Sequence, residues 1–271
     1  RDSEQSAPQY FHIATEGPRG LMARRYCLKR GRAYTTSSHT RFPEYVAARF
    51  PTGTGWLYRL VRRFHTGGCG CRVATASLEA ELRAHGFANL MRWSRGVDAE
   101  RFRQRPDADL GLARPVFIYV GRVAVEKNIE AFARLDLPGS KVVVGEGSAL
   151  EALRGRYADV HFLGLRKGEP LAEAYAAADV FVFPSLTDTF GNVLLEALAS
   201  GLPVAAYPVT GPKDVITDAR VGVLDDDLEK AALAALGLDA RDARSFALNY
   251  SWQASARTFR DNILTANAAA R

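Results

Sequence analysis

Residues 183–203 read FPSLTDTFGNVLLEALASGLP, and this stretch decides the fold. The apolar run just before it, residues 180–183, predicts a short buried strand that ends at Pro184. A polar loop follows, and the apolar residues after that loop recur at the spacing of a helix. Gly201 is placed to end the helix, and Pro203 begins the next strand. The stretch therefore predicts a strand, a loop, a helix and a second strand.

Asp188 and Glu196 are the two carboxylates of this unit. At roughly 100° per residue, eight positions return a helix to within about 80° of its starting face. Both carboxylates can therefore face the crevice at the carboxyl end of the strand, where open α/β sheets bind ligands. The Gly191 amide adds a helix N-terminus suited to an anion. A plainer interpretation stays open, in which Asp188 caps the helix and Glu196 faces solvent.

The same segment resembles the family 4 retaining glycosyltransferases of GT-B fold. The resemblance lies in an acidic residue, seven intervening residues and a Glu, with a Phe-Gly pair between them and EALASGLPV around and after the Glu. It implies that Asp188 contacts a donor sugar, although the family usually has Glu there, and that Glu196 holds the nucleotide ribose. The other donor contacts implied in this segment are Thr189, Phe190, Gly191 and Asn192.

A second match follows the strand predicted at residues 116–120, where the sequence reads GRVAVEKN. Gly121 permits a tight turn, Arg122 offers a guanidinium fork for phosphate oxygens, and Lys127 adds a point charge. In isolation such cations are more often solvated surface. Together they resemble the family's Gly-Arg…Glu-Lys signature, whose cations bind the donor diphosphate.

The resemblance also implies a site for the nucleotide base and a reaction scheme. Gly164 and Leu165 lie in a loop that resembles the one flanking the base, where backbone groups make the contacts. The implied catalytic set is His39, Arg122, Lys127, Asp188 and Glu196, with no protein nucleophile. No metal and no cofactor are expected, and the donor is expected to be GDP-mannose or a UDP-hexose.

The front of the chain supplies the residues expected on the acceptor side. Ser-His-Thr after a predicted strand resembles the family loop whose His approaches the transferred sugar, which makes His39 the candidate there. Glu16, Gly17 and Arg41 are expected beside it. A lone His after a strand is more often structural, and that interpretation stays open.

Strands and helices alternate along the chain, which predicts α/β architecture with parallel sheets. The resemblance implies a GT-B fold, with two Rossmann-like domains facing each other across a cleft. We expect a partial N-terminal domain over residues 1–96, a C-terminal nucleotide-sugar domain over residues 97–250, and a helix over residues 251–271 that crosses back. Family members begin with further strands before the part equivalent to Tyr10, so the first domain is expected to be incomplete and the activity of this chain uncertain. The strands are predicted at residues 10–14, 33–37, 72–75, 116–120, 141–144, 159–162, 180–183 and 204–206.

Composition narrows the class of protein. With 271 residues, 47% of them hydrophobic, the chain can bury one large core or two modest ones. No apolar run approaches the length needed to span a bilayer. The spacing of Cys69 and Cys71 fits neither a zinc site nor a dithiol redox motif, so free thiols in a reducing cytoplasm are expected.

Charge is distributed unevenly. Residues 1–96 hold 16 Lys and Arg against 6 Asp and Glu, whereas the remainder holds 20 against 24. The basic front half predicts an anionic partner. Residues 44–64 form an amphipathic, arginine-rich pattern that could lie on an anionic membrane, or could be an ordinary core-facing helix. No nucleic-acid motif is present, so nucleic acid is not an expected partner.

These features favour a glycosyltransferase that moves a hexose of mannose or glucose type to a lipid or saccharide acceptor. The expected location is the cytoplasm, either free or peripheral at the inner face of the membrane. The alternative is a catalytically inactive nucleotide-binding GT-B module with an interaction or regulatory role. A phosphorylase or an epimerase of the same fold is a weaker match, because neither has supporting motifs here.

Overall fold

The computed structural model describes residues 8–38, 43, 46, 53–188 and 190–269. The chain forms two compact units. Unit 1 comprises residues 1–94 and 253–271, and unit 2 comprises residues 95–252. The sequence predicts limits at residues 96 and 250, which lie within two residues of these.

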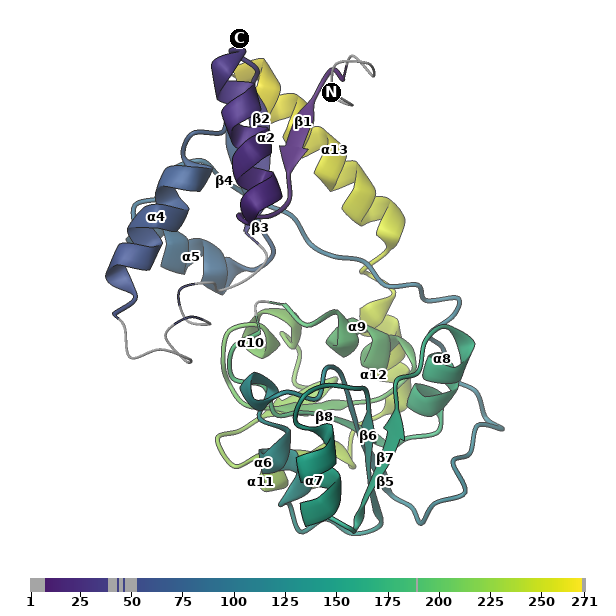
Figure 1. The fold of residues 1–271 in the computed structure, drawn as a ribbon. Helices are drawn as coiled ribbons and strands as arrows, with labels where there is room; N and C mark the ends of the chain where they lie inside the picture. Colours follow the sequence, from purple (N-terminus) through teal and green to yellow (C-terminus); the bar gives the residue numbers. More distant parts are fainter. Residues whose placement is uncertain (1–7, 39–42, 44–45, 47–52, 189, 270–271) are drawn as a thin grey trace. The chain divides into compact units, whose positions relative to one another are not determined.

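Unit 1 contains a four-stranded parallel sheet of order β1-β2-β3-β4 (Figure 1). The strands are β1 (Phe11–Ile13), β2 (Tyr34–Ser38), β3 (Gly70–Val73) and β4 (Leu90–Arg92). The helices are α2 (Pro18–Lys29), α4 (Gly55–His65), α5 (Ala76–Ala84) and, from the other end of the chain, α13 (Trp252–Ala269).

Side chains that alternate along these strands reach two different sets of helices. On one face, Ile13 and Tyr34 pack with Cys27 of α2 and Phe64 of α4. The opposite face carries Arg72, whose guanidinium lies 3.5 Å from the centre of the Phe259 ring on α13. Helix α13 is therefore part of unit 1, although 160 residues separate it from β4.

Arg72 is an unusual residue for a core. It is 1% exposed, and it donates to Thr35 Oγ1 and to the Phe259 carbonyl. Among the described residues no carboxylate pairs with it. Burial lowers the pKa of Arg72 to about 10. The aromatic face of Phe259 supplies part of the electrostatic compensation that a carboxylate would normally give.

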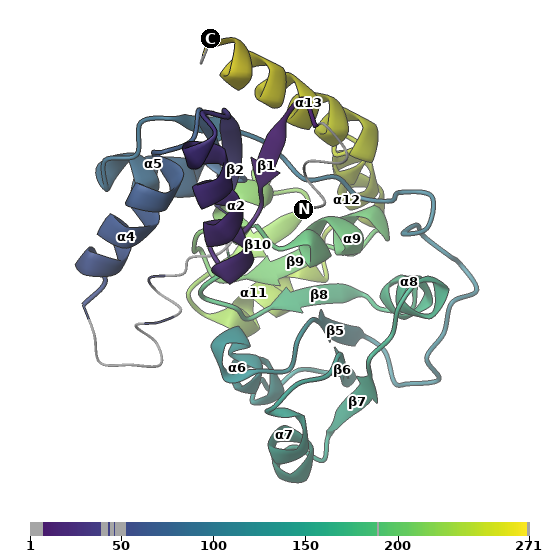
Figure 2. The same cartoon turned by 45° about the horizontal axis from the view of Figure 1, so that its top comes forward.

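Unit 2 is a doubly wound domain with a six-stranded sheet of order β10-β9-β8-β5-β6-β7, all parallel (Figure 2). The strands are β5 (Val116–Val120), β6 (Ser140–Val144), β7 (Val160–Gly164), β8 (Val180–Phe183), β9 (Val204–Ala206) and β10 (Gly222–Leu224). The helices are α6 (Ile129–Ala133), α7 (Leu150–Arg156), α8 (Glu169–Ala176), α9 (Asn192–Ala199), α10 (Pro212–Val215), α11 (Leu228–Ala235) and α12 (Ala240–Ala247), with one 3₁₀ turn, η1 (Val125–Lys127). The predicted α/β class is confirmed.

The strand order of unit 2 reverses between β5 and β8. From β5 the chain adds β6 and β7 on one side, then returns to place β8, β9 and β10 on the other. Helices α6, α7 and α11 supply apolar residues to the core on one face of this sheet. In doubly wound sheets, ligands bind outside the carboxyl ends of the strands at such a reversal.

Arg244 of α12 caps the C-terminal end of α9. Its guanidinium donates to three carbonyls, those of Ala199, Phe102 and Ala99, at 2.7, 2.6 and 2.8 Å. The Ala199 carbonyl ends α9, so a cation there also matches the helix dipole. This one side chain ties the segment that leads into unit 2 to two of its helices.

We predict that Arg244→Met lowers the free energy of unfolding of unit 2 by about 2–4 kcal/mol, because three partly buried carbonyl hydrogen bonds lose a charged donor. Urea denaturation of the full chain measures this. Arg241→Met is the matched control, since Arg241 lies on the same helix but is exposed and pairs only with its neighbour Asp239. Equal effects of the two substitutions would contradict the role given to Arg244.

Candidate functional site

A pocket of about 390 Å³ lies at the carboxyl ends of β5 and β6 in unit 2. Four of the residues predicted from the sequence line it: Gly121, Arg122, Leu165 and Glu196. The remaining lining residues are Val120, Val144, Gly145, Glu146, Arg166, Leu171 and Val193. The lining of the pocket therefore combines apolar side chains with four charged ones, those of Arg122, Glu146, Arg166 and Glu196.

Close approach of two strand ends shapes this pocket. The Gly145 amide donates to the Gly164 carbonyl at 2.9 Å, and the Gly121 amide donates to Val144 at 3.0 Å. A Cβ atom on Gly145 would stand 1.8 Å from the Gly121 carbonyl oxygen. Only glycine allows the turn after β6 to pack so closely against the turn after β5.

The two predicted phosphate-binding cations are both present at this edge of the sheet, each paired with a carboxylate. Arg122 binds Glu126 at 2.7 Å, and Lys127 binds Asp188 at 2.5 Å. Lys127 and Asp188 are 61 residues apart in sequence and are brought together by the pairing of β5 with β8. Three of these side chains are largely buried, whereas Arg122 is 55% exposed and is the one open to solvent.

The loop before α9 presents acceptor atoms. Asp188 Oδ2 and Asn192 Oδ1 are buried and have no hydrogen-bond partner among the described residues. The residue that caps α9 is Gly191, in the left-handed region at φ 77°, so Asp188 is not the N-cap. Phe190 is buried, and Thr189 lies outside the described residues.

Glu196 does not face bulk solvent. It lines the pocket, and its Oε2 accepts a hydrogen bond from the Tyr175 hydroxyl at 3.1 Å. Burial raises the pKa of Glu196, and the hydrogen bond from Tyr175 acts in the opposite direction. The plainer interpretation of both carboxylates, as a cap and a solvent-facing residue, is therefore wrong.

In unit 1 the described acceptor-side candidates are Glu16 and Gly17, in the turn between β1 and α2. Gly17 precedes the first residue of α2, and Glu16 Oε1 lies 2.9 Å from His65 Nε2. His39 and Arg41 lie outside the described residues. His65, which ends α4 and is fully buried, was not predicted, because no sequence pattern singles it out.

His65 contacts polar groups from two strands, β2 and β3, and from the turn after β1. Its Nδ1 lies 2.8 Å from Thr36 Oγ1 and 3.4 Å from Cys71 Sγ. Burial alone would lower the pKa of His65, but hydrogen bonds to Cys71 and Glu16 outweigh it and raise the pKa to about 9. The ring is therefore charged at neutral pH and holds the Glu16 carboxylate in place.

The described part of the amphipathic pattern at residues 44–64 has one buried side and one exposed side. Leu57, Val61 and Phe64 of α4 are buried in unit 1, so these residues form a core-facing helix, the second of the two interpretations. Trp56 and Leu60 are about half exposed, among three exposed arginines, Arg59, Arg62 and Arg63. Residues 44, 45 and 47–52 lie outside the described residues.

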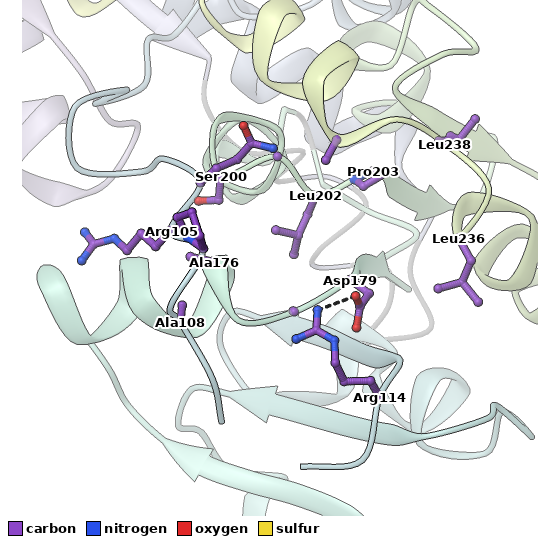
Figure 3. A pocket seen from close by; sticks show the side chains of 15 residues that line it. Arg105, Ala108, Arg114, Ala176, Asp179, Ser200, Leu202, Pro203, Leu236 and Leu238 are labelled. Carbon is purple, nitrogen blue, oxygen red and sulfur yellow. Dashed lines mark hydrogen bonds and ion pairs between the residues drawn. The ribbon is translucent and has the colours of Figure 1, made fainter. Parts of the chain in front are cut away.

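A second hollow in unit 2, of about 520 Å³, lies at the amino ends of the strands (Figure 3). Its charged groups satisfy one another: Arg114 pairs with Asp179 at 2.5 Å, and Arg105 pairs with Glu169 outside the hollow. Parallel sheets bind ligands at the other edge. We therefore place the functional site in the pocket at the carboxyl ends.

Within the described residues, no group of three or more His, Cys, Asp and Glu side chains is arranged to hold a metal ion. The same part of the chain contains no helix that is both long and apolar enough to cross a membrane. All three cysteines are free thiols.

Comparison with known proteins identifies the second unit. The family described as glycosyl transferases group 1 matches residues 114–238. These residues form a glycosyl transferases group 1 domain. The match contains every predicted donor-site residue of unit 2, from Gly121 to Glu196.

Two relatives extend this finding. The chain is 41% identical over 162 residues to a GDP-mannose-dependent alpha-mannosyltransferase of Mycobacterium tuberculosis, covering 56% of this chain and 42% of that protein. It is 32% identical over 235 residues to the enzyme of the same name from Mycolicibacterium smegmatis, covering 81% of this chain and 61% of that protein. The chain thus spans about half the length of these relatives.

A solved structure confirms the fold. Anabaena HepE in complex with UDP superposes with a TM-score of 0.76 at 15% identity, over 97% of this chain and 81% of that one. At that identity the likeness concerns the fold alone. The GT-B prediction is confirmed.

We predict that the charged state of His65 stabilises unit 1. A histidine with a raised pKa contributes stability below its unfolded pKa of 6.5 and loses it as pH rises through about 9. His65→Gln keeps a side chain that can form hydrogen bonds but cannot titrate. The wild-type free energy of unfolding should fall between pH 6 and 10 by on the order of 3 kcal/mol more than that of His65→Gln. Denaturant titrations at these pH values measure it, and parallel pH curves would rule the idea out.

Proposed function

We propose that the chain is a retaining glycosyltransferase that moves mannose from GDP-mannose to a lipid or saccharide acceptor, without a metal ion. The observation that carries this proposal is the pocket of unit 2, which Arg122 and Glu196 line together with apolar side chains, and beside it the Lys127–Asp188 pair at the same edge of the sheet. Both relatives are named GDP-mannose-dependent alpha-mannosyltransferases, which supports GDP-mannose as the donor. A UDP-hexose is the alternative donor, since HepE was crystallised with UDP.

In this proposal each part of the pocket binds one part of the donor. Leu165, Leu171 and Val193 form the apolar wall against which the nucleoside packs. Glu196 accepts hydrogen bonds from the ribose hydroxyls, and backbone groups near Gly164 contact the base. Arg122 and Lys127 bind the diphosphate, whose charge is also favourable at the N-terminus of α9.

Binding of the diphosphate has a consequence for Asp188. Lys127 is paired with Asp188 in the structure, so a diphosphate that recruits Lys127 weakens this pair. Asp188 Oδ2 is a buried acceptor without a partner among the described residues, which suits a sugar hydroxyl. Asp188, with Asn192 four residues further along the chain, would then orient the sugar.

The reaction breaks the bond between the anomeric carbon and the phosphate oxygen. Negative charge develops on the leaving diphosphate, where Arg122 and Lys127 are already placed, and one such donor is often worth about 3–4 kcal/mol. The acceptor hydroxyl attacks on the same face of the sugar and gives its proton to the departing phosphate oxygen. This scheme needs no protein nucleophile.

We predict that the full chain binds GDP in calorimetric titrations, more tightly than UDP or ADP. The double variant Arg122→Ala, Lys127→Ala should weaken binding by roughly 100-fold, because two charge-assisted hydrogen bonds of about 1.5 kcal/mol each are lost. The matched control is Arg220→Ala, Lys230→Ala, which removes two exposed cations of the same unit.

Three outcomes separate the possibilities. Tighter binding of UDP would replace the proposed donor with a UDP-hexose. GDP binding without release of GDP from GDP-mannose would favour the inactive nucleotide-binding module. A folded chain that binds none of the three nucleotides, or binds them equally in both double variants, would refute the donor site.

We further propose that unit 1 contacts an anionic membrane at the cytoplasmic face through the exposed side of α4. Trp56 and Leu60 lie one helical turn apart and are 50% and 56% exposed, with Arg59 and Arg63 on the same side. An aromatic and an aliphatic side chain among arginines suit the headgroup region of a bilayer. A lipid acceptor would be reached there.

We predict that the chain sediments with vesicles containing phosphatidylglycerol and not with vesicles of phosphatidylcholine alone. Each arginine near such a surface adds on the order of 1 kcal/mol, and salt should release the protein. Trp56→Ser, Leu60→Ser should abolish sedimentation. Leu233→Ser, Leu248→Ser, which alters exposed leucines of unit 2, should not. Equal sedimentation of both double variants would disprove the surface.

A further inference from the structure

A hydrogen bond between two side chains links the core of unit 2 to its pocket. The Tyr175 hydroxyl of α8 donates to Oε2 of Glu196 at 3.1 Å, and Tyr175 itself is fully buried. We propose that Tyr175 is the positioning residue of the ribose-binding carboxylate. The inference rests on the proposed function, in which Glu196 binds the ribose.

The tyrosine ring is fixed from two sides. Phe102, from the segment before β5, meets it edge to face at a centroid distance of 5.7 Å and an interplanar angle of 85°. Phe181 of β8 lies 5.8 Å away on a tilted plane. A side chain packed in this way occupies one rotamer, so its hydroxyl is a fixed point in the wall of the site.

Because the Tyr175 hydroxyl is held in place, the two oxygens of Glu196 have separate roles. Oε2 is engaged by Tyr175, and because Glu196 lines the pocket, Oε1 is left to accept hydrogen bonds from a ligand. A carboxylate held at one oxygen loses little conformational freedom when a diol binds to the other. Preorganisation of this kind gives affinity that depends on the ligand's hydroxyl groups.

The same hydrogen bond favours the ionised form of Glu196, which accepts hydrogen bonds. Burial favours the protonated acid, and a phenol that donates to the carboxylate favours the ionised form. The other titratable groups around the pocket are Arg122, Glu146 and Arg166. Tyr119, from β5, is a further neighbour of Tyr175. Removing only the phenolic oxygen leaves all of these groups in place.

The first test needs no ligand. With ¹³C-labelled glutamate, the Glu196 carboxyl signal is assigned by its loss in Glu196→Gln and is then followed against pH. In Tyr175→Phe the Glu196 midpoint should move to higher pH, because the donor that stabilises the carboxylate is gone. Tyr157→Phe is the matched control: Tyr157 donates to Glu130 at 2.9 Å in the same unit, so it should raise the Glu130 midpoint and leave Glu196 unchanged.

The second test compares nucleotides with and without the ribose 2′-hydroxyl group. Calorimetry with GDP and 2′-deoxy-GDP should show that the wild type prefers GDP by roughly 10-fold, the value of one hydrogen bond to a charged group. This preference should shrink to a few-fold in Tyr175→Phe and vanish in Glu196→Gln. It should persist in Tyr157→Phe.

The outcomes are distinguishable. If Tyr175→Phe weakens both nucleotides by the same factor, its role is only structural and the inference is overturned. An unmoved Glu196 midpoint, with the Glu130 midpoint moved by Tyr157→Phe, overturns it as well. If the wild type binds no nucleotide, the proposed function fails, and the Glu196 midpoint still decides whether Tyr175 controls this carboxylate.

Discussion

The pairing of β5 with β8 is the contact on which the chemistry of unit 2 depends. The strands align Phe117 with Val180 and Ile118 with Phe181, and the strand order of the sheet reverses across this pair. The loop after β5 carries the two cations, and the loop and helix after β8 carry the two carboxylates. A slip of one residue in this register would move each buried side chain of one strand to the opposite face of the sheet and shift Lys127 relative to Asp188.

Much of this arrangement could be predicted from the sequence, because the central strands of a parallel sheet are continuous apolar runs. The predicted limits of β5, β8 and β9 agree with the structure. Two short strands at sheet edges, β4 and β10, were not predicted, since three partly exposed residues give no periodic signal. The family resemblance, and not periodicity, assigned roles to Arg122, Lys127, Asp188 and Glu196.

Which site residues contact one another was harder to predict than which residues belong to the site. The contact of Arg122 with Glu126 joins residues four apart in the turn after β5, whereas Lys127 meets Asp188 because two strands are adjacent. Tyr175 has the sequence context of an ordinary core residue in an alanine-rich helix, and its partner lies 21 residues away. His65 likewise ends an arginine-rich helix, and nothing in the order of residues connects it with Glu16. Likewise, helical spacing shows that α4 is amphipathic without showing which apolar residues are buried.

The position of α13 determines how the two units can be made. Unit 2 is one continuous stretch of chain, but unit 1 is assembled from both ends, with Phe259 covering the buried charge of Arg72. Unit 2 can fold from residues that are all made before residues 253–269 of α13, whereas Arg72 of unit 1 stays uncovered until α13 has been added. A fragment that ends near residue 94 would leave that charged face of the sheet bare. Separate preparation of unit 1 therefore requires joining the two ends of the chain, for example by circular permutation.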